Sequence, residues 1–182
     1  MSLPCRTAIA ALYAAAAATA PASAGAQEPA VTLIDTAVLM APRLGESSGI
    51  AASRHRPGVF WTHNDSGDGP ILYATDSTGA DLGYVTVAWA RNFDWEDLGA
   101  GPCTRSSGTC LFVGDVGDNG ARRPVINVYV LPEPEPPSNP GDTLRSAAVE
   151  DIIVLRYPDR PHDAEAIAIV GGSLFEIGRA HV

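Results

Sequence analysis

The feature that most constrains the fold of this 182-residue chain is a recurring pattern of short apolar runs, each followed by a turn. The runs are rich in β-branched and aromatic residues, and no stretch after residue 26 holds a helical period. Gly, Pro, Asn and Asp fill the segments between them, where they favour turns through positive φ, fixed φ and Asx hydrogen bonds. Four consecutive runs are predicted to form an antiparallel meander: residues 48–52, 59–63, 71–75 and 82–87.

The same pattern then starts again. The acidic opening at residues 46–50 has a counterpart at residues 94–99, and the strand at 60–65 that ends in Asp has a counterpart at 110–115. A third acidic opening begins at residues 163–168. Further strands are predicted at residues 125–130, 151–157 and 173–175, with the Pro-rich stretch 132–140 outside the sheet.

A four-stranded unit that repeats about every 50 residues, with one acidic opening per unit, is typical of β-propeller blades. We therefore predict an all-β partial propeller over residues 46–176, made of two four-stranded blades and the start of a third, after a lead-in at residues 27–45. The alternative is a β-sandwich, which also consists of short strands. A sandwich gives no reason for the acidic opening to recur every four strands.

The first 26 residues have the pattern of a signal peptide. Arg6 precedes an apolar run at residues 8–18, and the small residues at 22–26 fit the site that signal peptidase cleaves. The apolar run is shorter than the roughly 20 residues that cross a bilayer, and no later segment reaches that length. We expect an exported protein, extracellular or periplasmic, with no membrane span after signal removal.

The charge of the chain bears on its partners. The formal net charge is -9, and no basic cluster stands out in the sequence. We therefore exclude nucleic acid and expect an unknown small molecule or protein as the partner. The many carboxylates also allow a divalent cation.

Two cysteines remain after the signal, Cys103 and Cys110, and they bracket a turn-rich segment. In an oxidising compartment, such a pair is expected to form a hairpin disulfide. A zinc site would need more Cys or His nearby.

The predicted blades are too few to close a ring, since propellers have about four to eight blades. A ring cut after two blades would expose an unpaired edge and an apolar face between blades. The last six residues, 177–182, read as a translation of ATC GGA AGA GCA CAC GTC, which lies within a common sequencing-library adapter. We expect these six residues to be adapter-derived rather than native.

Five motifs carry a resemblance to a known group of proteins: ESSG at 46–49, WTHNDSG at 61–67, DWED at 94–97, GDVGDN at 114–119 and DAEA at 163–166. The chain resembles a poorly characterised family of secreted bacterial β-propeller proteins. It is also distantly similar to the propellers of phytase-like esterases and calcium-dependent lactonases. The resemblance implies a propeller whose blade-opening acids point toward the central channel.

The same geometry follows from the predicted repeat. The innermost strand of each blade lines the axis, so Glu46, Glu96 and Glu165 are expected to converge at one channel mouth. Converging carboxylates repel one another unless they are protonated or paired with a cation, and Ca²⁺ prefers such oxygen ligands. Residues at nearby strand ends are predicted to complete the shell: Asn64, Asp65, Asp115, Asp118 and Asn119.

Each of these residues has a structural alternative. The Asp and Asn residues can make Asx turns, and the glutamates can pair with Arg43, Arg54 or Arg91. Trp95, inside the DWED motif, is interpreted as a packing residue.

Two functional classes follow. The first is a binding or scaffold propeller with a structural Ca²⁺. The alternative is a calcium-dependent hydrolase of the phosphoesterase or lactonase kind, in which the ion would polarise the substrate. His63, at a strand end, is the catalytic candidate; its structural alternative is a histidine hydrogen-bonded within a turn. No G-x-S-x-G nucleophile motif occurs.

Overall fold

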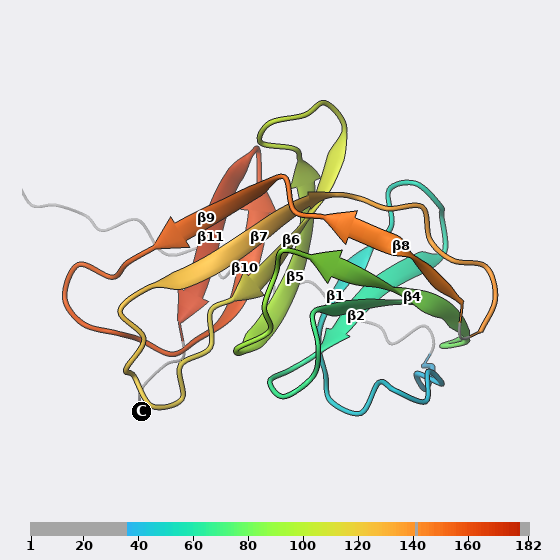
Figure 1. The fold of residues 1–182 in the computed structure, drawn as a ribbon, viewed down its shortest axis with the longest axis horizontal. Coiled ribbons are helices and arrows are strands. Elements are labelled where there is room, and N and C mark those ends of the chain that lie inside the picture. The colour runs from blue at the N-terminus through green and yellow to red at the C-terminus, as the bar shows by residue number, and fades with distance from the viewer. Residues whose placement is uncertain (1–35, 141, 179–182) are drawn as a thin grey trace, which may run out of the picture. The chain divides into compact units, whose positions relative to one another are not determined.

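A computed structural model describes residues 36–140 and 142–178 of the chain. The predicted signal peptide, residues 27–35 of the lead-in and residues 179–182 lie outside these ranges. Within them, all regular secondary structure is β, in eleven strands that form three open sheets (Figure 1). The described residues contain no helix of the length and apolarity needed to cross a membrane. The prediction of an all-β fold is confirmed.

The first sheet has the strand order β1-β2-β3-β4-β8. Its first four strands form the antiparallel meander that the turn pattern predicts, with Ala51 opposite Trp61 and Trp61 opposite Ala74. The strands are β1 (Ser47–Ala52), β2 (Val59–Asn64), β3 (Ile71–Asp76), β4 (Asp81–Ala88) and β8 (Thr143–Ala148).

The second sheet repeats this arrangement, and the third begins it again. The second has the order β5-β6-β7-β9, with antiparallel neighbours throughout, and the third is the antiparallel pair β10-β11. The strands are β5 (Trp95–Pro102), β6 (Thr109–Asp115), β7 (Ile126–Pro132), β9 (Asp151–Leu155), β10 (Ala164–Val170) and β11 (Ser173–Gly178).

Strand β8 differs from the prediction, which left residues 143–148 without regular structure. The Pro-rich stretch does lie outside the sheets after Pro132, but the chain then returns and pairs parallel with β4. The segment reads TLRSAA and has no run of β-branched or aromatic residues. The free backbone groups on the edge of β4, rather than local propensity, provide its pairing partner.

Two apolar clusters fill the spaces between the sheets. Side chains alternate between the two faces of a strand, so Leu111 and Val113 of β6 pack toward the first sheet, with Trp61, while Cys110 and Phe112 pack toward the third. The central sheet is therefore buried on both faces.

The first strands of the three sheets lie next to one another, since β5 contacts both β1 and β10 (Figure 1). Glycines permit this approach. A Cβ atom on Gly49 of β1 would lie 2.5 Å from the backbone nitrogen of Leu98 in β5, and one on Gly101 of β5 would lie 2.4 Å from Cγ2 of Ile169 in β10. The starts of β1, β5 and β10 are thus brought to one region of the molecule.

Candidate functional site

The candidate site is built around the start of β5. Trp95 is fully buried in the core between the first two sheets, and its indole N–H donates to the carbonyl of Arg91 at 2.9 Å. The packing role predicted for Trp95 fits this position. Asp94 immediately precedes β5, and Glu96 lies where the pairing of β5 with β6 shifts register, between Trp95 and Asp97.

Three carboxylates meet at this point. Asp65, which follows β2, contributes one oxygen to a group with Asp94 and Glu96, and the three ligand atoms lie within 4.8 Å of one another. Glu96 is only 8% exposed, and Asp65 and Asp94 are half-buried. Asp65 and Glu96 are among the ligands predicted from the sequence, and Asp94 is not, although it belongs to the same DWED motif as Glu96.

Two of these carboxyl groups, those of Glu96 and Asp94, have a raised pKa. Burial, followed by the negative charges of Asp65 and Asp94, raises the pKa of Glu96 to about 7, and Glu165 and Asp163 add to the effect. Burial also raises the pKa of Asp94, with Asp65 as the next contribution, while Arg123 opposes it. The site therefore holds more negative charge than its surroundings neutralise.

Backbone and hydroxyl groups hold the cluster in place. The Ser48 hydroxyl on β1 donates to the Glu96 carbonyl at 2.8 Å and lies 3.4 Å from Glu96 Oε2. The Asn92 amide donates to the carbonyl of Asp65 at 2.7 Å. Gly117 leaves room for both acids, because a Cβ atom there would lie 2.4 Å from Glu96 Oε1 and 2.6 Å from Asp94 Oδ2.

Three other predicted ligands lie at the end of β6 or on the loop that follows it. Asp115 is buried and accepts from Arg123 Nη1 and from the backbone N–H of Asp94, both at 3.0 Å. Asp118 is also buried, and one of its oxygens accepts from the backbone N–H of Arg123 at 2.6 Å. Asn119 is exposed. Asp115 and Asp118 thus stabilise the loop, as the Asx-turn alternative expects.

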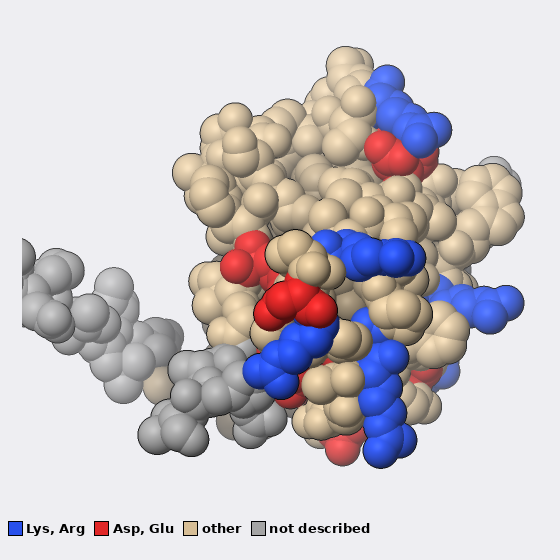
Figure 2. Space-filling model, turned by 90° about the vertical axis from the view of Figure 1, so that its left-hand side faces the viewer, with Lys and Arg blue, Asp and Glu red and all other residues tan. Residues whose placement is uncertain are grey.

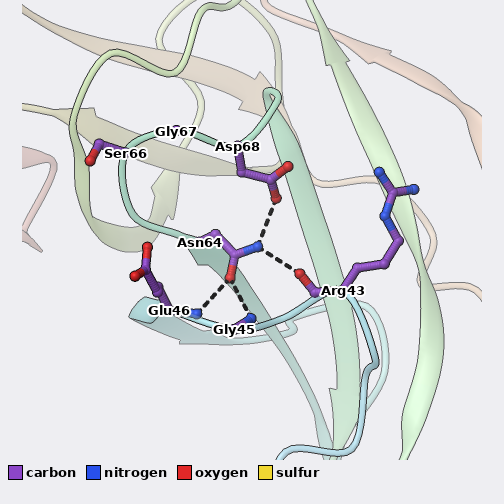
Figure 3. A pocket seen from close by; sticks show the side chains of 7 residues that line it. All are labelled: Arg43, Gly45, Glu46, Asn64, Ser66, Gly67 and Asp68. Carbon is purple, nitrogen blue, oxygen red and sulfur yellow. Dashed lines mark hydrogen bonds between the residues drawn. The ribbon is translucent and has the colours of Figure 1, made fainter.

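Asn64 and Glu46 lie in a separate hollow of about 600 Å³ (Figure 3). The Asn64 side-chain oxygen accepts from the backbone N–H groups of Gly45 and Glu46, both at 3.0 Å. Its amide nitrogen donates to the Arg43 carbonyl at 2.8 Å and to Asp68 Oδ2 at 2.7 Å. These bonds occupy both amide hydrogens and the oxygen, so Asn64 is a structural clamp, and the exposed Glu46 side chain lines this hollow rather than the acidic cluster.

The third predicted glutamate, Glu165, is exposed and lies on β10. Its charge contributes to raising the pKa of Glu96, which places the two carboxylates within electrostatic reach of each other. Of the three glutamates expected to converge, Glu96 and Glu165 are near each other.

His63, the catalytic candidate, is fully buried. Its Nδ1–H donates to the carbonyl of Asn64 at 2.9 Å, and its ring meets that of Trp95 edge-on at 5.5 Å between centroids. Desolvation lowers the pKa of the imidazole, which keeps it neutral. The structural alternative expects a histidine hydrogen-bonded within a turn; His63 is hydrogen-bonded to the backbone, but it lies near the end of strand β2.

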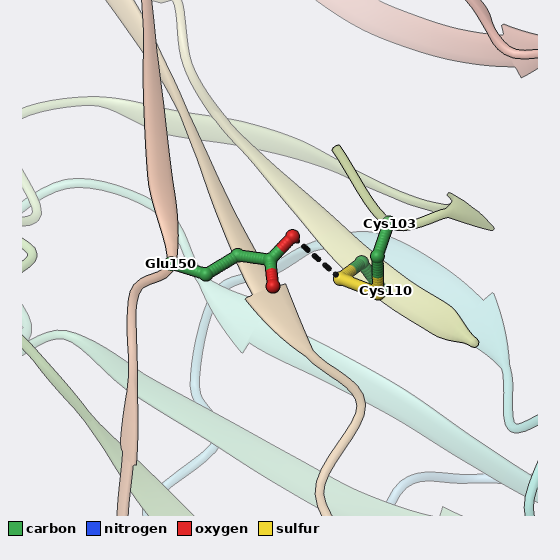
Figure 4. Close-up of side chains that lie close together, drawn as sticks. All are labelled: Cys103, Cys110 and Glu150. Carbon is green, nitrogen blue, oxygen red and sulfur yellow. Dashed lines mark hydrogen bonds between the residues drawn. A yellow bond between two sulfur atoms is a disulfide. The ribbon is translucent and has the colours of Figure 1, made fainter. Parts of the chain in front are cut away.

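Cys103 and Cys110 lie at disulfide distance, with their sulfur atoms 2.10 Å apart, so the predicted pairing is confirmed (Figure 4). Glu150 Oε1 lies 3.5 Å from Cys110 Sγ and accepts the backbone N–H groups of Thr104 and Arg105, both at 3.1 Å. A disulfide offers no thiolate to a metal. This trio therefore fastens the loop between β5 and β6.

No family model, curated protein or solved structure matches the chain. Its functional assignment rests on the geometry described above.

Proposed function

We propose that this protein is an exported β-propeller that acts as a binding or scaffold module, with a Ca²⁺ site formed by Asp65, Asp94 and Glu96. The proposal has two parts, the propeller and the cation site, and each part has its own support.

The propeller is supported by the order of the sheets. Consecutive stretches of chain form consecutive meanders, and the first strand of each contacts the first strand of the next. A sandwich has two sheets that share one core, whereas the central sheet here packs on a third sheet as well as the first. In a propeller, each blade that has a neighbour on either side is buried on both faces of its sheet. The disulfide pair fits an oxidising compartment outside the cytoplasm.

The cation site is supported by one observation above all. Three carboxylate oxygens lie within 4.8 Å of one another around the buried Glu96. In the part of the chain that the structure describes, no arginine forms a salt bridge with Asp65, Asp94 or Glu96. Buried like charges are stabilised by a cation, and Ca²⁺ takes oxygen ligands from carboxylates and carbonyls.

A binding module is favoured over a calcium-dependent hydrolase. Catalysis would need a base that can reach a substrate, and His63 is fully buried, with Nδ1 bonded to a backbone carbonyl. In this proposal the ion links the first sheet to the second, since Asp65 follows β2 and Glu96 lies on β5.

Calorimetric titration of the chain with Ca²⁺ tests the cation site. Glu96→Gln and Asp94→Asn are expected to weaken binding at least about tenfold, because each removes one charged ligand. Glu135→Gln is the matched control, since that side chain is 83% exposed and lies outside the cluster. Absence of binding at millimolar Ca²⁺ would overturn the cation site. Hydrolysis of phosphoesters or lactones that depends on Ca²⁺ and on Glu96 would favour the hydrolase instead.

A further inference from the structure

Besides the hollow at Asn64, the molecule has a second hollow, whose lining is rich in positive charge, opposite to that of the acidic cluster. It has a volume of about 240 Å³ and lies between the loop that joins β6 to β7 and the loop that joins β9 to β10. Figure 2 shows arginine side chains gathered on one face of the molecule, close to a few acidic ones. The hollow is lined by Arg122, Arg123, Pro124, Arg156, Tyr157, Asp159, Arg160 and Pro161.

The gathering of positive charge is unusual for this chain. Only 12 basic residues occur in the whole sequence, whose formal net charge is -9, and four of them line this one hollow. The hollow has a single carboxylate, that of Asp159. Within the described residues, Arg122, Arg156 and Arg160 form no salt bridge, and all three are exposed.

Arg123 differs from the other three because the fold holds it in place. Its Nη1 donates to Asp115 Oδ1 at 3.0 Å and to the Gly117 carbonyl at 2.7 Å, and its guanidinium lies 5.8 Å from the centroid of the Phe93 ring. Arg123 therefore supplies a fixed guanidinium whose charge is paired with Asp115, and the three exposed arginines supply the positive charge that is unpaired among the described residues.

The two loops are stiffened where they meet the hollow. Pro124 and Pro161 fix φ at one position in each loop. The Tyr157 hydroxyl donates to Glu176, and His162 lies 3.0 Å from Asp159 and packs edge-on against Tyr157. The aromatic ring of Tyr157 and the imidazole of His162 thus hold the second loop in shape.

We propose that this arginine hollow binds a phosphate-type oxyanion, either free phosphate or the phosphate group of a small phosphomonoester. A guanidinium presents paired N–H donors that match two oxygens of a phosphate, and several guanidiniums together offset its charge. A hollow of about 240 Å³ fits one such group. The negative charge of the remainder of the chain opposes a long polyanion such as nucleic acid.

Calorimetric titration of the full chain with inorganic phosphate, in EDTA and at low salt, tests this proposal. The chelator removes Ca²⁺, so the outcome is independent of the proposed cation site. Glycerol phosphate, in a parallel titration, distinguishes a phosphomonoester from free phosphate as the preferred ligand. The double variant Arg156→Gln/Arg160→Gln removes two exposed donors, and Arg54→Gln is the matched control, because Arg54 is exposed and lies outside the hollow.

Phosphate is expected to bind the native chain and the Arg54→Gln control equally. The double variant is expected to bind at least about tenfold more weakly, since two charge-assisted contacts are lost. Because the substituted side chains are exposed, thermal unfolding is expected to give the same midpoint for all three proteins. Equal weakening in the control, or no binding of phosphate or glycerol phosphate to the native chain, would overturn the proposal.

Discussion

Asp97 accepts a hydrogen bond from the backbone N–H of Ile167, at 2.8 Å, and so joins β5 to β10. The two strands belong to different sheets, and their residues lie 70 positions apart in the chain. The other oxygen of Asp97 accepts from the backbone N–H of Leu98 at 2.7 Å. On the opposite side of β5, Ser48 makes the corresponding link from β1 to the carbonyl of Glu96.

Replacing Asp97 by alanine is expected to destabilise the protein. The substitution leaves the N–H of Ile167 without its acceptor, and a hydrogen bond to a charged group contributes about 2 kcal/mol. Urea unfolding is expected to show a loss of that size. Asp97→Asn keeps a side-chain oxygen and is expected to lose less than half as much, whereas equal stability of Asp97→Ala and the native protein would contradict this role.

The sequence predicts the local elements better than it predicts their contacts. The strands of the two meanders and the pairing of Cys103 with Cys110 follow from turn residues and spacing. Strand β8 does not follow from the local sequence, because its pairing depends on the edge of β4, more than 50 residues earlier in the chain.

In the candidate site too, the sequence predicts the motif better than it predicts the contacts of its residues. The DWED motif marks the start of β5, but it does not identify Asp94 as a neighbour of Glu96, because the register shift between Trp95 and Asp97 breaks the simple alternation of side chains. Asp115 and Asp118 have the same residue type as a metal ligand, but one oxygen of each already accepts hydrogen bonds from Arg123 or from backbone N–H groups. Composition cannot distinguish these two uses of a carboxylate, because the difference lies in partners that are distant in sequence.

Glu96 is expected to make stability depend on pH. Its pKa is raised from 4.5 to about 7 in the folded chain, so between these pH values the folded protein keeps a proton that the unfolded chain has lost. Stability therefore falls as pH rises through this window, and the penalty is complete above pH 7. Without Ca²⁺, Glu96→Gln is expected to exceed the native protein in stability by on the order of 2 kcal/mol at high pH, and by much less at low pH.

Urea unfolding of both proteins across this pH range measures the difference. Added Ca²⁺ is expected to stabilise the native protein at high pH and to affect Glu96→Gln far less, because the variant lacks one ligand charge. A difference between the two proteins that does not change with pH would show that Glu96 is not the titrating group.

His63 is expected to change the stability of the protein with pH in the opposite direction to Glu96. Burial lowers the pKa of the imidazole below 6.5, so the unfolded chain binds a proton that the folded chain does not. The stability that the neutral imidazole provides is fully present above pH 6.5 and is lost as pH falls toward the lowered pKa. His63→Phe keeps a ring against Trp95 and removes the titration.

The measurement for His63 is the stability of the two proteins on acidification. The native protein is expected to lose about 1 kcal/mol more than His63→Phe per pH unit within the window. The variant starts lower at neutral pH, because it lacks the bond from Nδ1 to the Asn64 carbonyl. Parallel pH profiles would mean that the imidazole titrates alike in the folded and unfolded chains.

Replacing Trp89 by glycine is expected to stabilise the protein, which is a rare effect for the loss of a large aromatic side chain. Trp89 follows β4 with φ of 67°, in the left-handed region, and its side chain is 78% exposed. A non-glycine residue there costs roughly 1–2 kcal/mol, and an exposed side chain returns little of that through packing. Trp89→Gly is therefore expected to raise the free energy of unfolding by about 1 kcal/mol. Trp89→Ala, the control, removes the indole but keeps Cβ and is expected to give no gain. If alanine stabilised the protein as much as glycine does, the gain would come from loss of the exposed ring and not from relief of backbone strain.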